Sequence, residues 1–274
     1  MIKIDQKQLT GRAAWVRSRV FEMIVGAGKG HIGGSLSCTD ILVALYHGGG
    51  LRFDAADPEW SGRDRFIFSK GHSAEAVYAV LADVGFFEEE LLGTYGQRGS
   101  KLGSHVDRSI PGIEVSTGSL GHGLGIGAGL ALAAKLDNED HLIVGLLGDG
   151  ECYEGSVWEA AMCAGKHKLA NLTAIIDYNK LQSYGLTSEV QDLEPLADKW
   201  RSFGFAVRGV DGHDMTALNR VFAALPFEAT RPSAVICHTV KGKGISYAEG
   251  NPAWHHKSEI SAEEIGALYN ELRA

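Results

Sequence analysis

Four strand-like runs separated by helix-like runs organise the second half of the chain. The strand-like runs cover residues 141–147, 171–178, 205–210 and 233–240, and helical patterns fill 155–169, 193–204 and 214–225. A strand, a helical crossover and a further strand form a βαβ unit, in which the two strands are parallel and the crossover is right-handed. The pattern therefore predicts an α/β fold: a doubly wound, mostly parallel sheet with helices on both faces.

The first half is richer in helix. Residues 10–28 and 38–48 have helical patterns, and Thr39 or Asp40 is expected to cap the second of these helices. Residues 63–86 have the pattern of a strand, a turn and a helix. Because no repeat, low-complexity tract or linker divides the chain, we expect a single domain over residues 1–274.

Composition excludes several classes of partner. The net charge is −8 without a basic block, so nucleic acid and anionic membrane are not expected partners. The N-terminus has no apolar signal region, and no apolar run is long enough to cross a bilayer. The four cysteines are scattered and form no CxxC pair. A cytoplasmic location is therefore expected.

Polar residues follow two of the predicted strands. The buried run that ends at residue 147 leads into Gly148-Asp149-Gly150, and Asn179 follows the next strand. Ligands of such sheets bind beyond the carboxyl ends of the strands, and one crossover makes these two ends neighbours. A carboxylate and an amide oxygen suit Mg²⁺ or Ca²⁺, and glycines let a bulky anion approach the backbone. Each motif alone is typical of a turn, but together they indicate a metal and anion site.

The motif also has a family resemblance. A GDG triplet followed by Asn about thirty residues later resembles the thiamine diphosphate motif, and the surrounding blocks resemble the N-terminal, diphosphate-binding region of transketolases. These blocks are "GKGHIGGSLSCTDILVALY", "SKGHSAEAVYAVL", "PGIEVSTGSLGHGLGIGAGLALA", "GDGECYEG" with "DYNK", and "KGKGISYAEGNPAWHHK". Their order matches the family over nearly the whole chain.

The resemblance implies a cofactor and a metal site. The side chains of Asp149 and Asn179 and the backbone carbonyl of Leu181 would bind Mg²⁺, which Ca²⁺ or Mn²⁺ could replace. Gly150 and Glu151 would begin the next helix and turn their N–H groups toward the diphosphate of thiamine diphosphate.

Further residues are implied near the cofactor. Gly118 and Leu120 would pass close to it, with Leu120 beside the thiazolium ring. Glu154 would belong to an acidic network near the cofactor at a subunit interface. His122 stands where many family members have Gln, and its role is open. Small residues at Gly125, Gly127 and Gly129 favour close packing of their helix.

Four histidines are implied to act on the substrate: His31, His72, His105 and His255. Histidine moves protons near neutral pH, as a ketol substrate requires at its hydroxyl groups. His72 would also contact the diphosphate. The family's Trp-His-Gly-Lys pattern favours His255 over His256. Lys241 and Lys257 are either phosphate contacts or surface lysines.

The resemblance implies that the chain corresponds to about half of a family enzyme, without the pyrimidine-binding domain and its glutamate. The resemblance thus implies the N-terminal subunit of a split transketolase. It would transfer a two-carbon ketol unit from a ketose phosphate to an aldose phosphate. The expected partner is a C-terminal transketolase subunit, and the expected assembly is a homodimer or heterotetramer.

Other interpretations stay open at this point. The same half-enzyme could serve a sulfonated or branched sugar phosphate, or belong to an enzyme like deoxyxylulose-phosphate synthase. A non-catalytic regulatory binding subunit is an alternative of another class. A nucleotide-binding oxidoreductase is disfavoured, because the glycine-rich stretch from residue 116 contains no G-x-G-x-x-G fingerprint.

Overall fold

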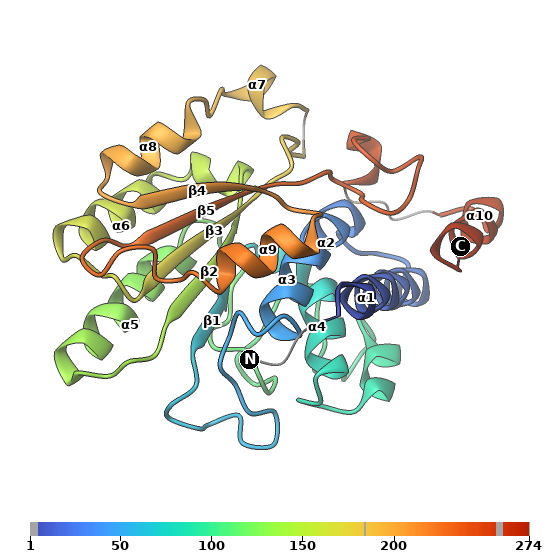
Figure 1. Cartoon of the computed structure of the whole chain (residues 1–274). Helices are drawn as coiled ribbons and strands as arrows, with labels where there is room; N and C mark the ends of the chain where they lie inside the picture. Colours follow the sequence, from blue (N-terminus) through green and yellow to red (C-terminus); the bar gives the residue numbers. More distant parts are fainter. Residues whose placement is uncertain (1–4, 184, 256–259, 274) are drawn as a thin grey trace.

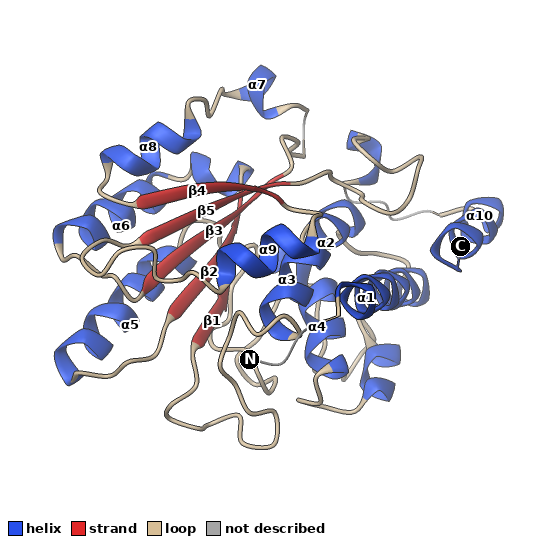
Figure 2. Cartoon of the chain, viewed as in Figure 1, coloured by secondary structure: helices blue, strands red, loops and turns tan. Residues whose placement is uncertain are grey.

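The computed structural model describes residues 5–183, 185–255 and 260–273. Its centre is a five-stranded sheet with the strand order β1-β2-β3-β5-β4, in which every neighbouring pair is parallel (Figures 1 and 2). The strands are β1 (Arg65–Phe68), β2 (Ile143–Gly148), β3 (Leu172–Tyr178), β4 (Ala206–Asp211) and β5 (Ser233–His238). The expected α/β fold with a parallel sheet is confirmed. The predicted strand at 63–86 is the edge strand β1, next to β2.

Helices cover both faces of the sheet. One face carries α1 (Gln6–Ala27), α2 (Ile32–Ser37), α3 (Thr39–Tyr46), α4 (Ala74–Asp83) and α9 (Met215–Phe222), and the other carries α5 (Gly123–Asp137), α6 (Gly155–Lys166) and α8 (Leu196–Ser202) (Figure 1). The remaining helices are the short α7 (Thr187–Val190) and α10 (Ala262–Arg273), which packs against α1. Short 3₁₀ turns are η1 (Gly71–Ser73), η2 (Glu89–Thr94), η3 (Gly150–Tyr153) and η4 (Pro252–Trp254). No helix within the described ranges has the length and apolarity needed to cross a membrane.

The sheet separates two apolar cores. Strands β2 and β3 are buried along their whole length, as expected of parallel strands covered on both faces. Alternate residues of each strand feed the two cores: Val144 packs with the helices of the first face, and Ile143 packs with α5 and α6. This arrangement leaves the carboxyl edge of the sheet to polar loops.

The expected cap of α3 is wrong. The helix follows Cys38 without a side-chain hydrogen bond at its cap. Asp40 instead lies buried and forms a two-pronged ion pair with Arg17 of α1, so its carboxylate joins two helices. A charge paired in the interior is not free to serve a helix end.

The glycines of α5 differ from one another. A Cβ at Gly127 would lie 3.3 Å from Ile67 and Leu172, so this position is closely packed, as expected. A Cβ at Gly125 would just reach Ala160 at 4.0 Å, and one at Gly129 would meet nothing within 4 Å. The expectation of close packing is therefore wrong for Gly129, which lies exposed on the outer side of the helix.

Candidate functional site

One polar cavity of about 270 Å³ opens at the carboxyl edge of the sheet. Its walls are the loops that follow β1, β2, β3 and β5, together with the start of α2. The lining residues are His31, Gly34, Lys70, His72, Gly118, Leu120, Gly148, Asp149, Gly150, Glu151, Asn179, Leu181, Gln182, Ser183, Lys241 and His255. The sequence-based site residues thus converge here, except His105, which adjoins the cavity, and Glu154.

The three expected metal ligands lie on two neighbouring loops. Asp149 caps the turn η3, where one carboxylate oxygen accepts the Gly150 N–H at 2.7 Å and the other accepts the Lys180 N–H. The side-chain oxygen of Asn179 accepts the Leu181 N–H at 3.1 Å. These contacts hold the two side chains at adjacent strand ends, as the order of β2 and β3 requires.

Buried residues set the orientation of the Asn179 amide. Its nitrogen lies 3.4 Å from Asp177 Oδ2 and 3.4 Å from Ser37 Oγ, which are both hydrogen-bond acceptors. The amide oxygen is therefore the atom on the side of Leu181. Asp177 in turn forms an ion pair with Lys70, and both side chains are buried, at 0% and 2% exposure.

The donor set fits a hard divalent cation. A carboxylate, an amide oxygen and a backbone carbonyl are the ligands that Mg²⁺ takes when phosphate and water complete its shell. A positive group already lies among them, because the Lys241 ammonium donates to the Leu181 carbonyl at 2.7 Å. No cluster of three or more His, Cys, Asp or Glu side chains that could bind a metal occurs in the described ranges, so any ion here depends on this mixed set.

The electrostatics of the cavity favour the binding of ions next to Asp149 and Lys241. Burial, followed by the nearby Asp177 carboxylate, raises the pKa of Asp149 to about 7. Burial, followed by the Lys70 ammonium, lowers the pKa of Lys241 to about 8. The protein thus disfavours the charged forms of both Asp149 and Lys241. A cation next to Asp149 would stabilise its carboxylate, and an anion next to Lys70 and Lys241 would stabilise the Lys241 ammonium.

Of the four expected histidines, His31 lies at the centre and the other three surround it. The ring centroid of His31 lies 5.2 Å from that of His72, 6.0 Å from that of His105 and 5.9 Å from that of His255. Burial, then the positive charge of Lys70, lowers the pKa of His72 well below its usual value. His72 is therefore neutral at pH 7, and one of its ring nitrogens can accept a hydrogen bond.

The loop before α5 brings Gly118 against His105. Gly118 has φ +149°, and a Cβ there would lie 2.6 Å from the His105 ring, so only glycine suits this position. Leu120 lines the cavity, whereas His122 is exposed and its ring contacts the Leu120 carbonyl. Glu154 is also exposed and lies beside Gly121, away from the cavity wall.

Gly150 and Glu151 begin a short 3₁₀ helix and not the α-helix that follows it. They form the 3₁₀ turn η3, and α6 begins at Gly155. The Gly150 N–H is engaged by the Asp149 carboxylate. Glu151 is buried, and its carboxylate accepts the N–H groups of Gly121 and Gly148, so it ties the loop before α5 to the end of β2.

Sequence reasoning missed three of the side chains that line the cavity, those of Lys70, Gln182 and Ser183. Lys70 follows β1, and the parallel order of the sheet could have placed it at the ligand edge. Gln182 and Ser183 follow Leu181, and Ser183 Oγ lies 3.1 Å from His255 Nε2. His256 and Lys257 lie outside the described residues, so the choice between His255 and His256 stays a prediction.

Lys241 reaches the cavity on a loop that is fixed to distant helices. The ring of His213 contacts Asp40 at 2.7 Å and accepts the Val240 N–H at 2.9 Å. Arg17, the ion-pair partner of Asp40, donates to the Lys243 carbonyl at 3.0 Å. The backbone on both sides of Lys241 is therefore anchored by one buried network.

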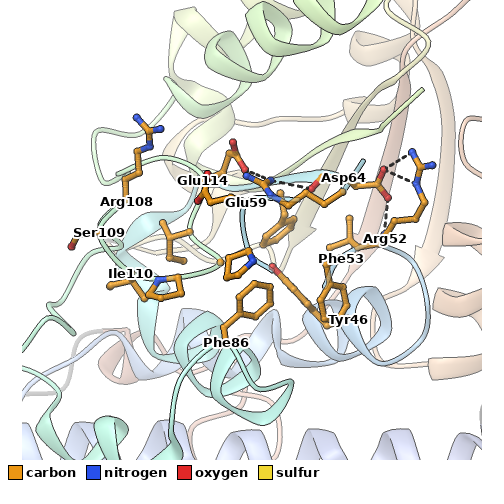
Figure 3. A pocket seen from close by; sticks show the side chains of 17 residues that line it. Tyr46, Arg52, Phe53, Glu59, Asp64, Phe86, Arg108, Ser109, Ile110 and Glu114 are labelled. Carbon is orange, nitrogen blue, oxygen red and sulfur yellow. Dashed lines mark hydrogen bonds and ion pairs between the residues drawn. The ribbon is translucent and has the colours of Figure 1, made fainter. Parts of the chain in front are cut away.

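A second cavity, of about 290 Å³, lies away from these residues, near the start of β1 (Figure 3). Aromatic side chains, among them Tyr46, Phe53 and Phe86, form one wall, and the ion pair between Arg63 and Glu114 borders it. None of the expected site residues lines this cavity.

The parallel sheet carries a GDG turn and an Asn at adjacent strand ends, the arrangement that the resemblance to thiamine diphosphate enzymes implied. A family model described as "Transketolase, thiamine diphosphate binding domain" matches residues 10–273. The chain therefore belongs to the transketolase thiamine diphosphate binding domain family.

Relatives of two lengths share this region. The chain is 47% identical over 240 residues to one of the subunits of the apulose-4-phosphate transketolase of Phocaeicola vulgatus, covering 88% of this chain and 85% of that protein. It is 43% identical over 269 residues to a 6-deoxy-6-sulfo-D-fructose transketolase subunit of a Clostridium species, covering 98% and 97%. The Campylobacter jejuni transketolase structure superposes with a TM-score of 0.90 at 31% identity, over 97% of this chain and 42% of that one. The chain thus spans nearly all of the subunits but less than half of the longer enzyme.

Proposed function

We propose that this chain is the diphosphate-binding subunit of a two-chain transketolase-type enzyme. With its partner it transfers a two-carbon ketol unit from a ketose phosphate to an aldose phosphate. The observation that carries the proposal is that the three expected metal ligands and three of the four histidines line one cavity of a transketolase-family chain. A regulatory subunit without chemistry would not need His31, His72 and His255 on that wall.

The chain's own residues would divide the work. Asp149, Asn179 and the Leu181 carbonyl would hold Mg²⁺ at the diphosphate, while Lys70 and Lys241 supply positive charge around it. Thiamine diphosphate, when bound, supplies the carbon nucleophile and electron sink for breaking the carbon–carbon bond. Gly118 and Leu120 would border the cofactor.

The histidines would handle the substrate hydroxyl groups. His72, neutral at pH 7, would accept a hydrogen bond or a proton, and His31, His105 and His255 surround the same space. Correctly placed imidazoles contribute about 10²–10⁴-fold through general acid–base catalysis.

The metal assignment is tested by calorimetry. Asp149→Ala should lose Mg²⁺-dependent binding of thiamine diphosphate in the presence of the partner subunit, because diphosphate charge is left uncompensated. The exposed Asp198→Ala serves as the matched control. Unchanged affinity in Asp149→Ala would refute the assignment.

The partner is proposed to be a separate C-terminal transketolase subunit that carries the pyrimidine-binding domain. Two of the similar relatives are named as subunits, in keeping with a divided enzyme. The outer face of α5 and α6 also exposes Ile126, Leu136 and Met162, at 39%, 72% and 57%, as an interface would. We propose that a second copy or the partner covers this face, with Glu154 near its border, in a homodimer or heterotetramer.

Partner dependence is tested with the purified chain. The chain saturated with thiamine diphosphate and Mg²⁺ should show no ketol transfer, and mixing with a co-expressed C-terminal subunit should restore it. Robust turnover by this chain alone would overturn the two-chain proposal.

The sugar is the finer part of the proposal. The named relatives act on apulose 4-phosphate and 6-deoxy-6-sulfo-D-fructose, so branched and sulfonated ketoses join the unbranched ketose phosphates as candidate donors. A donor panel of these three classes, with one aldose phosphate acceptor, should give a kcat/KM at least tenfold higher for one class. Equal values for all three would contradict a specific donor site in the assembled enzyme.

A further inference from the structure

Helix α4 is in contact with the backbone of two site histidines and directly follows a third. His72 lies in η1, and α4 begins at Ala74. Glu75 and Tyr78 are three residues apart on α4, so their side chains project from the same side of the helix. Both are fully buried, at 0% exposure, and neither lines the polar cavity.

The Glu75 carboxylate anchors the segment that carries His31. It accepts the His31 N–H at 3.1 Å, the Ser35 hydroxyl at 2.8 Å and the Tyr95 hydroxyl at 2.6 Å. A Cβ at Gly30 would lie 2.6 Å from this carboxylate, so the backbone before His31 is pressed against it. Three donors converge on one buried acid, which fixes the start of α2 relative to α4.

The Tyr78 hydroxyl anchors the loop that carries His105. It donates to the His105 carbonyl at 2.9 Å. The loop around His105 has no regular secondary structure, and the His105 side chain is exposed. A hydrogen bond from a rigid buried helix is therefore a strong constraint on where this ring stands.

We propose that Glu75 and Tyr78 are positioning residues, which make α4 the common support that sets the spacing of His31, His72 and His105. They touch neither cofactor nor substrate, and they act through the backbone of the histidines. The inference rests on the proposed ketol-transfer function. A misplacement of about 1 Å in a catalytic group can cost roughly 10²-fold in rate, so these hydrogen bonds bear on turnover.

The test compares Tyr78→Phe and Glu75→Gln with the control Tyr46→Phe. Tyr46 is also buried, and its hydroxyl borders the second cavity without a hydrogen-bond partner among the described residues. Two readouts are used: kcat, KM and thiamine diphosphate affinity with the partner subunit, and imidazole ¹H–¹³C resonances of the chain alone, assigned with His31→Gln and His105→Gln.

Tyr78→Phe should lower kcat about 10- to 100-fold with cofactor affinity within about twofold, and should shift the His105 resonance. Glu75→Gln should shift the His31 resonance, because a neutral amide oxygen is a weaker acceptor than a carboxylate for the His31 N–H and the Tyr95 hydroxyl. Its NH2 group would also face the Ser35 hydroxyl, which now donates to the carboxylate. If Glu75→Gln does not fold, Tyr95→Phe removes one donor and should give a smaller shift of the same resonance. Tyr46→Phe should change none of these values.

Unshifted histidine resonances in both α4 variants would overturn the proposal. It would also be overturned if the α4 variants lost no more turnover than the control Tyr46→Phe. A parent enzyme without ketol transfer on any donor would refute the proposed function instead. The resonance shifts, measured without substrate, would then still decide the positioning role.

Discussion

Replacing Lys70 by Met should destabilise the chain severely. The Lys70 ammonium pairs with Asp177 and donates to the Gly34 carbonyl at 3.0 Å, at a place where neither ion-pair side chain is more than 2% exposed. Met keeps the unbranched stem but removes both the charge and the N–H that donates to the Gly34 carbonyl. Asp177 would keep the hydroxyl groups of Ser37 and Thr239 as donors, but no positive partner in direct contact.

The expected cost follows from this geometry. Removing one member of a buried ion pair costs about 3–5 kcal/mol, because the remaining charge is left uncompensated. For a chain of this size that loss corresponds to a drop in Tm of about 6–20 °C. Lys70→Met/Asp177→Asn removes both charges and should recover about 2 kcal/mol or more of the loss.

Urea denaturation of the parent, both single variants and the double variant measures the cycle. The loss should also depend on pH, because burial without Lys70 would raise the pKa of Asp177, which Lys70 now helps to lower. The folded Lys70→Met variant would then bind a proton more readily than its unfolded state, so its deficit should shrink as the pH falls from 8 to 5. A loss below about 1 kcal/mol, or a double variant no more stable than Lys70→Met, would refute the reasoning.

Three further expectations concern protonation and backbone conformation. Burial lowers the pKa of His72 in the folded chain, so below about pH 6.5 the unfolded state takes up the proton first. The free energy of unfolding should therefore decrease as the pH is lowered from 7 to 5, and His72→Asn should make this decrease smaller in urea titrations. Gly118→Ala should lower kcat at least tenfold while circular dichroism is unchanged, because its methyl would enter the His105 ring; full turnover would contradict this. Gly129→Ala should stabilise the isolated chain by up to about 1 kcal/mol. Gly165→Ala should destabilise it, because its Cβ would lie 2.0 Å from the Phe203 carbonyl oxygen. Equal urea midpoints for the two variants would contradict this difference.

The centre of the sheet was predictable because β2 and β3 are buried on both faces. The run at 142–147 is apolar apart from one Gly, and the four expected runs give strands at 143–148, 172–178, 206–211 and 233–238. Parallel order then brings Asp149 and Asn179 to one edge without knowledge of any side-chain contact. The grouping of the histidines, in contrast, came from family resemblance, since they lie far apart in the sequence.

Local helix chemistry was less predictable. Asp40 has the position of an N-cap residue, yet Arg17, 23 residues away, holds its carboxylate. Gly150 and Glu151 resemble the start of an α-helix, yet they form a 3₁₀ turn in which the Glu151 carboxylate accepts the N–H groups of Gly121 and Gly148. In both cases a long-range contact overrides a local preference, and such contacts are not visible in a pattern of neighbouring residues.

The same limit applies to the supports of the site. Glu75 lies in an ordinary-looking helical stretch, and only the fold shows that it meets Tyr95 and the start of α2. Lys70 likewise gives no sign in the sequence that it would be buried against Asp177.

The anchoring of the loop around Lys241 has a consequence for exchanging segments between related enzymes. Val240 and Lys243 are each held by a side chain from elsewhere, His213 and Arg17. If residues 239–250 of this chain were moved into a related enzyme, the Lys241 ammonium would keep its place in the cavity only if that enzyme also had residues equivalent to His213 and Arg17. Arg17, His213 and the loop must therefore be exchanged together, although more than 220 residues separate Arg17 from Lys243 in the sequence.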